Sequence, residues 1–327
     1  MKKLLITTAI ISLAASINAA AVDAYVYPTG NTANSIQGYA TVTKNNPMVN
    51  NVYLHFADLG KFYTQEQQAS YTKNWSQSYP YTQAIKQVAI AVANGAPCEY
   101  GQLYPQCFSA YDSGSQIQYT ALIHSTNQNP QASEVIQVLK ATNKNPAIQW
   151  PDSINGQPNH NYFTGISFDL ESRGSAEFYQ DVMAKLKSNN IPLTVSIYLN
   201  PDEVNQIKGI ASDFAINNSH GNFIIVPAYN GATPIITSTL ANIIASTKAA
   251  NLGVDVRFKI AIDAENSGEI DSEIANIRKA FGNTIPSNYA GIVIFNYPRI
   301  SNDANNTDVA KITAFAKELR QQQLLGE

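Results

Sequence analysis

The chain has little charge, few cysteines and, beyond its first residues, no apolar run of membrane-spanning length. Only 14% of its 327 residues are charged, against the roughly 25% usual in soluble proteins. The formal net charge of −3 provides no basic face, so we expect no nucleic-acid partner. Hydrophobic residues make up 44%, which is enough for a large core and excludes disorder.

The first residues have the pattern of a secretory signal. Lys2 and Lys3 precede an apolar run from Leu4 to Ala15, and small residues continue through Ala21. The competing interpretation, a membrane anchor, is disfavoured because the run is shorter than the ~20 residues that span a bilayer. We therefore expect a signal peptide over residues 1–21 and one mature domain over 22–327. The product would be a secreted or periplasmic monomer with no membrane anchor and a charge of about −5.

The two cysteines, Cys98 and Cys107, are separated by eight residues. In an exported chain, this spacing predicts a local disulfide. The four histidines show no ligand spacing with the cysteines or with one another, so we expect no bound metal. We also recognise no motif for an organic cofactor and expect none.

Short apolar runs alternate with longer segments of helical period, a pattern typical of parallel βα units. Strands are predicted over residues 23–27, 51–58, 116–124, 162–171, 191–199, 222–229, 257–263 and 289–297. Helices are predicted over 175–189, 202–217, 235–251, 270–281 and 307–322. The order and length favour an α/β fold, a single-domain (β/α)8 TIM barrel. A doubly wound open sheet is the alternative, but no Gly-rich phosphate turn follows the first strand.

One connection is much longer than the others. Residues 60–115 separate the second and third strands and hold ten aromatic residues together with both cysteines. We expect this insertion to form a lid or groove wall, or to pack its aromatic residues against the outer helices.

The fourth predicted strand ends in two carboxylates. Because strand side chains alternate between faces, Ser167, Asp169 and Glu171 share one side. If that side faces the barrel axis, the paired charges would raise one pKa and produce a neutral acid that can protonate a leaving group. The alternative is that Asp169 caps a turn and Glu171 is solvated.

The segment TGISFDLE (164–171) resembles the fourth-strand signature of glycoside hydrolase family 18, D-G-x-D-x-D-x-E, found in chitinases and endo-β-N-acetylglucosaminidases. VPAYN (226–230) resembles the sixth-strand motif of that family, and NVYLHFAD (51–58) is similar to its second strand. AIDAE (261–265) and GIVIFN (291–296) fall where its seventh and eighth strands would lie. The resemblance implies a TIM barrel that acts on a polysaccharide or oligosaccharide containing N-acetylglucosamine.

The resemblance also implies residue roles. Glu171 would be the general acid, and the substrate's own acetamido oxygen would attack the anomeric carbon. Asp169 would orient and balance the charge of the acetamido group, and Tyr229 would hydrogen-bond its oxygen. Further glycan contacts are expected from Tyr27, Phe56, Ser167, Asn230, Asp263, Glu265 and Phe295. Trp150, before the fourth strand, is either a sugar platform or packs over the barrel edge.

Several residues depart from the family pattern. Thr164 and Ser167 replace two aspartates, and Phe295 stands where the family usually has Trp. A catalytically weak or silent carbohydrate-binding protein is therefore a second hypothesis. A third uses Glu171 with Asp263 or Glu265 as a protein nucleophile, for which the carboxyl groups would lie about 5 Å apart.

Overall fold

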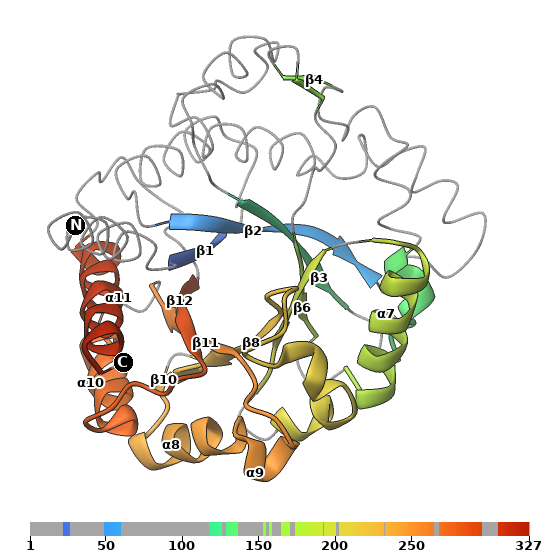
Figure 1. The fold of residues 1–327 in the computed structure, drawn as a ribbon. Coiled ribbons are helices and arrows are strands. Elements are labelled where there is room, and N and C mark those ends of the chain that lie inside the picture. The colour runs from blue at the N-terminus through green and yellow to red at the C-terminus, as the bar shows by residue number, and fades with distance from the viewer. Residues whose placement is uncertain are drawn as a thin grey trace, which may run out of the picture.

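The computed structural model describes residues 22–26, 49–59, 118–125, 129–136, 153–154, 157–158, 165–170, 174–191, 193–200, 203–231, 233–264, 268–295 and 307–326. Within these ranges, eight parallel strands are hydrogen-bonded into a closed barrel in the order β1-β12-β11-β8-β7-β6-β3-β2 (Figure 1). They are β1 (Val22–Val26), β2 (Val49–Asp58), β3 (Gln118–His124), β6 (Gly165–Asp169), β7 (Thr194–Tyr198), β8 (Phe223–Pro227), β11 (Phe258–Asp263) and β12 (Tyr289–Phe295). Each coincides with a strand predicted from an apolar run.

The strands are apolar on both faces because each face is buried, as is usual for parallel sheets. Alternate residues point outward and pack against the helices, as Ile166 and Phe168 of β6 do. The residues between them point inward and form a separate cluster in the barrel interior. That inner cluster comprises Tyr25, Tyr53, Leu122, Phe223, Ile225, Tyr229, Ala261 and Val293, with Tyr198 and Phe295 packed against it.

A polar network lies in the barrel interior at the N-terminal ends of the strands. The Lys259 ammonium contacts Asp23 Oδ2 at 2.6 Å, and the Tyr53 hydroxyl donates to the same oxygen at 2.6 Å. Asn51 lies 3.4 Å from that oxygen and accepts a hydrogen bond from Thr120 at 3.0 Å. Burial, followed by the charge of Asp23, raises the pKa of Tyr53 well above its usual value. The phenol therefore stays protonated and acts as a donor.

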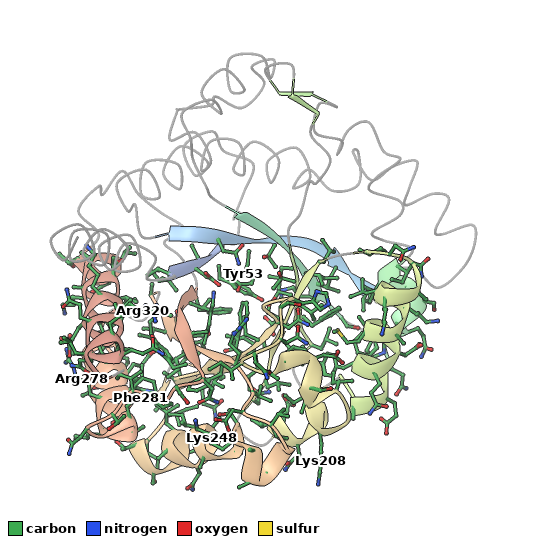
Figure 2. The ribbon with its side chains drawn as sticks, in the orientation of Figure 1. Tyr53, Lys208, Lys248, Arg278, Phe281 and Arg320 are labelled. Carbon is green, nitrogen blue, oxygen red and sulfur yellow. The ribbon has the colours of Figure 1, made fainter. Side chains whose placement is uncertain are left out.

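The described helices lie around the outside of the barrel (Figure 1). They include α7 (Ala176–Ser188), α8 (Thr237–Ser246), α9 (Ala249–Leu252), α10 (Ile270–Phe281) and α11 (Thr307–Gly326), together with helical residues 132–136. In α7, the Ser175 hydroxyl accepts a hydrogen bond from the Phe178 N–H at 3.1 Å and caps the N-terminus. Figure 2 shows Tyr53 among the strands, whereas Lys208 and Lys248 lie at the outer edge of the molecule.

The predicted helix over 202–217 is wrong in type. The structure has a 3-10 helix, η3 (Val204–Phe214), with non-helical backbone at Ile210. Its buried residues Val204, Ile207, Ile210, Ala211 and Phe214 follow the three- and four-residue spacing of an α-helix. The spacing of apolar residues therefore did not distinguish the two helix types.

The single helix predicted over 235–251 is divided into α8 and α9. The Ser246 hydroxyl donates to the Ile243 carbonyl at 2.6 Å, and the Thr247 hydroxyl donates to the Ile244 carbonyl at 2.7 Å. Such side-chain bonds compete with helix continuation. Lys248 then adopts an extended backbone, and Asp255 accepts a hydrogen bond from Ala249 N–H at 2.9 Å at the start of α9.

Two short hairpins accompany the barrel. One pairs β4 (Ser153–Ile154) with β5 (Gln157–Pro158), and the other pairs β9 (Tyr229–Asn230) with β10 (Thr233–Pro234). The predicted signal peptide, both cysteines and nearly all of the long connection lie outside the described residues. Among the helices that the structure does describe, none is both long and apolar enough to cross a membrane.

Candidate functional site

Polar and aromatic side chains gather where the barrel strands end. Asp169 ends β6, Tyr198 ends β7, Asp263 ends β11 and Phe295 ends β12, while Tyr229 follows β8 by two residues. These strands are neighbours in the order β6, β7, β8, β11 and β12. The carboxyl ends of parallel barrel strands are where α/β barrels build their active sites. The sequence predicted four of these residues for the site and missed Tyr198.

An aromatic cluster lies beneath and between these ends. The Phe295 ring centroid lies 5.0 Å from that of Tyr25, 5.5 Å from that of Tyr229 and 6.0 Å from that of Tyr198. Tyr25 also stacks on Tyr53 at 5.1 Å, deeper in the barrel. Tilted and stacked pairs at these distances are favourable aromatic arrangements. The interior therefore offers an apolar floor beside the strand-end carboxylates.

Tyr229 has one tyrosine neighbour, Tyr198, and two carboxylate neighbours, Asp169 and Asp263. The Tyr198 and Tyr229 hydroxyls are hydrogen-bonded to each other at 2.9 Å, and each phenol can act as donor or acceptor. The pKa of Tyr229 lies well above its usual value, and burial is the largest cause. Tyr198 and the negative charges of Asp263 and Asp169 raise this pKa further. Tyr229 is therefore a neutral hydrogen-bond donor with a carboxylate on either side.

Asp169 has a histidine neighbour that the sequence interpretation missed. His124 ends β3, in register with Asp169, and its Nε2 atom lies 3.9 Å from Asp169 Oδ2. The Asp169 side chain is 6% exposed and the His124 side chain 20% exposed. Counting alternate residues forward from Leu122 would have placed His124 on the inner face.

Asp263 is supported from outside the barrel by Glu273 of α10. The Glu273 carboxylate accepts a hydrogen bond from the Asp263 backbone N–H at 3.2 Å. Burial raises the pKa of Glu273 to about 8, opposed by this hydrogen bond and assisted by the nearby charges of Asp263 and Glu269. Glu273 is thus a buried acid that is mostly neutral at pH 7.

Replacing Glu273 with Gln should remove a pH-dependent loss of stability. The folded-state pKa of about 8 lies above the ordinary glutamate value of 4.5, so the stabilising contribution of the protonated side chain is complete below pH 4.5 and is lost as pH rises towards 8. Gln does not titrate and can still accept from Asp263. We expect the wild type to lose roughly 2–5 kcal/mol relative to Glu273→Gln between pH 5 and 8, measured by urea unfolding.

The matched control for this measurement is Glu177→Gln, because Glu177 is exposed in the first turn of α7. Its pH dependence should stay close to that of the wild type. Parallel pH profiles for the wild type and Glu273→Gln would show that Glu273 is ionised throughout and would overturn the prediction.

The remaining predicted site residues lie in different places. Ser167 is fully buried one layer below Asp169, and its hydroxyl has no hydrogen-bond partner within the part of the chain that the structure describes. Asn230 is exposed and pairs with Thr233 in the β9–β10 hairpin. Phe56 belongs to β2, and the structure describes its backbone but not its side chain. Four more predicted residues lie outside the described residues, namely Tyr27, Trp150, Glu171 and Glu265.

Among the described residues, no group of three or more His, Cys, Asp or Glu side chains could hold a metal ion. The site as described offers carboxylates, phenols, an imidazole and aromatic rings. Those groups can hydrogen-bond and stack on a neutral polar ligand and can stabilise a developing positive charge.

No family model and no curated protein sequence matches the chain. Concanavalin B has a similar structure, with a TM-score of 0.50 and 12% identity over 90% of this chain and 99% of that one. A chitinase from Ipomoea carnea gives 0.45 with 13% identity, covering 91% of this chain and 99% of that one. The catalytic domain of a hyperthermophilic chitinase from Pyrococcus furiosus gives 0.42 with 10% identity, covering 91% and 95%. At these identities, the similarity to concanavalin B concerns the fold alone.

Proposed function

We propose that this protein is a secreted or periplasmic glycoside hydrolase with a complete (β/α)8 barrel. Its substrates are glycans that contain β-1,4-linked N-acetylglucosamine, and its mechanism is retaining and substrate-assisted. The observation that carries the proposal is the meeting of Asp169, Tyr229 and Asp263 at the strand ends, beside the ring of Phe295. The fourth-strand sequence TGISFDLE adds the acid, Glu171, two residues after Asp169.

The chemistry begins with proton transfer from Glu171 to the glycosidic oxygen. The acetamido oxygen of the substrate attacks the anomeric carbon as the leaving sugar departs with that proton. Glu171, now a carboxylate, takes a proton from water, and the resulting nucleophile opens the cyclic oxazolinium ion. Two inversions at one carbon retain its configuration.

Asp169 and Tyr229 would act on the acetamido group rather than on the glycosidic bond. The Asp169 carboxylate would accept the acetamido N–H and balance the positive charge that forms on the ring. Tyr229 would donate its phenolic proton to the acetamido oxygen, with Tyr198 donating in turn to the Tyr229 hydroxyl, to which it is hydrogen-bonded at 2.9 Å. Its raised pKa keeps that proton in place at physiological pH.

A carbohydrate-binding protein without turnover is the second candidate function. The observation that favours it is Ser167, a buried hydroxyl beneath Asp169 where the resembling family has an aspartate. A serine carries no charge to pass to Asp169. The aromatic cluster would still bind a sugar face in such a protein.

Hydrolysis of a fluorogenic N-acetylglucosamine oligomer by the mature protein tests the proposal, with binding of the unlabelled oligomer measured in parallel. We expect turnover, a product of retained β configuration by NMR, and inhibition by a thiazoline analogue of the oxazolinium ion. Retention without thiazoline inhibition would favour a protein nucleophile such as Asp263 or Glu265. Binding without turnover would favour the lectin function. The absence of both binding and turnover would overturn both candidate functions.

A further inference from the structure

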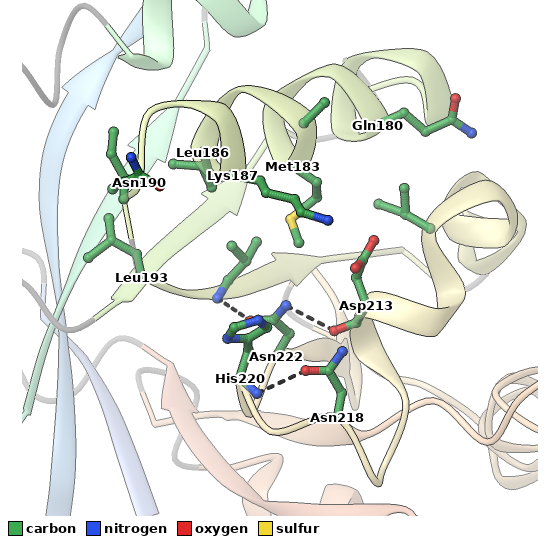
Figure 3. Close-up of a pocket in the computed structure, with 14 residues that line it drawn as sticks. Gln180, Met183, Leu186, Lys187, Asn190, Leu193, Asp213, Asn218, His220 and Asn222 are labelled. Carbon is green, nitrogen blue, oxygen red and sulfur yellow. Dashed lines mark hydrogen bonds between the residues drawn. The ribbon is translucent and has the colours of Figure 1, made fainter.

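A cavity of about 570 Å³ lies outside the barrel, between α7 and η3 (Figure 3). It lies beside the N-terminal ends of β7 and β8, because Leu193 precedes β7 and Asn222 precedes β8 in its wall. The candidate glycosidase site is at the opposite, carboxyl ends of the strands. This cavity therefore belongs to no function assigned above, and its volume is within the range of small-molecule sites.

The floor of the cavity is aliphatic. Leu186, Val195 and Ile210 are buried beneath it, and Met183 and Leu193 are half-buried at its sides. Methionine is flexible and polarizable, so Met183 can adapt to an apolar group that enters. Among the described residues, no Phe, Tyr or Trp lines the cavity, so this part of the chain offers no aromatic stacking surface for a sugar ring there.

Opposite charges face each other across the opening. Lys187 reaches in from α7, and the Asp213 carboxylate points in from η3 (Figure 3). Among the described residues, neither charged group has an ion-pair or hydrogen-bond partner. The neighbouring Lys185, by contrast, pairs with Asp181 at 3.6 Å. Two unpaired charges of opposite sign above an aliphatic floor are complementary to a ligand that is both zwitterionic and apolar.

The wall that carries Asp213 is held in place before any ligand enters. Asn222 is buried, accepts a hydrogen bond from Val195 N–H at 2.8 Å, and donates to the Asp213 carbonyl at 2.9 Å. The segment between η3 and β8 is also held by Thr194, whose hydroxyl donates a hydrogen bond to the His220 carbonyl at 3.1 Å. Preorganised groups lower the entropic cost of binding.

We propose that this cavity binds a short apolar peptide or a free apolar amino acid. The ligand carboxylate would pair with Lys187, its ammonium with Asp213, and its aliphatic side chains would cover Met183, Leu186 and Ile210. The proposal is independent of the glycosidase function. It assigns a second ligand class, apolar zwitterions, to a cavity on the outside of the barrel, away from the carboxyl ends of the strands.

The dipeptide Leu-Leu and the methionine methyl group provide the test. The chain has three methionines, of which Met183 is the only one after residue 48, so methyl-¹³C methionine labelling gives a nearly empty spectrum. We expect Leu-Leu to shift the Met183 methyl signal in a saturable way, with assignment from Met183→Leu. Lys187→Gln and Asp213→Asn should each weaken binding at least about fivefold, and blocking both termini of the dipeptide should weaken it further.

The matched control is Lys185→Gln, which removes the same charge from the same helix at a residue outside the cavity. It should leave the affinity for Leu-Leu within about twofold. Failure of Leu-Leu to shift the Met183 signal at concentrations up to about 20 mM would overturn the proposal. A shift that is equally strong in Lys187→Gln and Asp213→Asn would do the same, because binding would then ignore the charges.

Discussion

Glu171→Gln should lower hydrolysis of the N-acetylglucosamine oligomer by about 10³-fold or more while leaving oligomer affinity within about threefold. Gln has nearly the same shape as Glu but cannot donate a proton to the glycosidic oxygen. Because this proton is transferred only in the transition state, the loss should fall on kcat rather than on binding. Initial rates at saturating oligomer, with affinity from calorimetry, separate the two.

Glu177→Gln is the control for this experiment, since it makes the same change six residues further along the chain, at an exposed position of α7. Its rate should equal that of the wild type. Retained turnover in Glu171→Gln would assign the acid to another residue, and Asp263 would be the next to replace. Loss of both binding and turnover with intact folding would contradict a role confined to proton transfer.

Lys259→Met should destabilise the fold by about 3–5 kcal/mol, because it leaves the Asp23 carboxylate buried without its cation. The Asp23 side chain is 0% exposed and the Lys259 side chain 10% exposed, and their 2.6 Å contact lies inside the barrel. Asp23 Oδ1 has no hydrogen-bond partner among the residues that the structure describes, and Oδ2 carries the contacts from Lys259 and Tyr53. Urea unfolding followed by circular dichroism measures the change.

Lys311→Met is the matched control. Lys311 pairs with Asp271 at 3.0 Å, but their side chains are 46% and 76% exposed, so the same substitution should cost under about 1 kcal/mol. The double variant Asp23→Asn/Lys259→Met should recover part of the loss, since it removes the unpaired charge. Equal destabilisation by Lys259→Met and Lys311→Met would show that the buried pair contributes no more than a surface pair.

The strands were predictable because their signal is local. A strand buried on both faces must be apolar along its length, and each of the eight predicted runs overlaps a barrel strand. The same holds for α10, whose buried stripe Ile270, Ile274 and Ile277 follows helical spacing, and whose bounds agree with the prediction. The predicted helices were wrong where local side-chain bonds interrupted the helix, as at Thr247, and where the backbone left α-helical geometry, as in η3.

The candidate site was predictable only in part. Alternation along one strand placed Asp169 on an inner face, and its position at the end of β6 marked it as a candidate before any contact was known. The neighbours of Asp169 and Tyr229 could not be read from one strand, because His124 and Tyr198 reach them from adjacent strands. Those contacts depend on which strands are adjacent and on their register.

By itself, the sequence determined the class of the fold, the order of its strands and which strand ends carry carboxylates, since each depends on the periodicity of a short segment. Closure of the barrel decided the rest. It joined Asp23 to Lys259, 236 residues apart, and brought Phe295 against Tyr25. It also left the cavity between α7 and η3 with Lys187 and Asp213 at its opening. Contacts between distant segments follow from register and packing, which no local pattern of residues encodes.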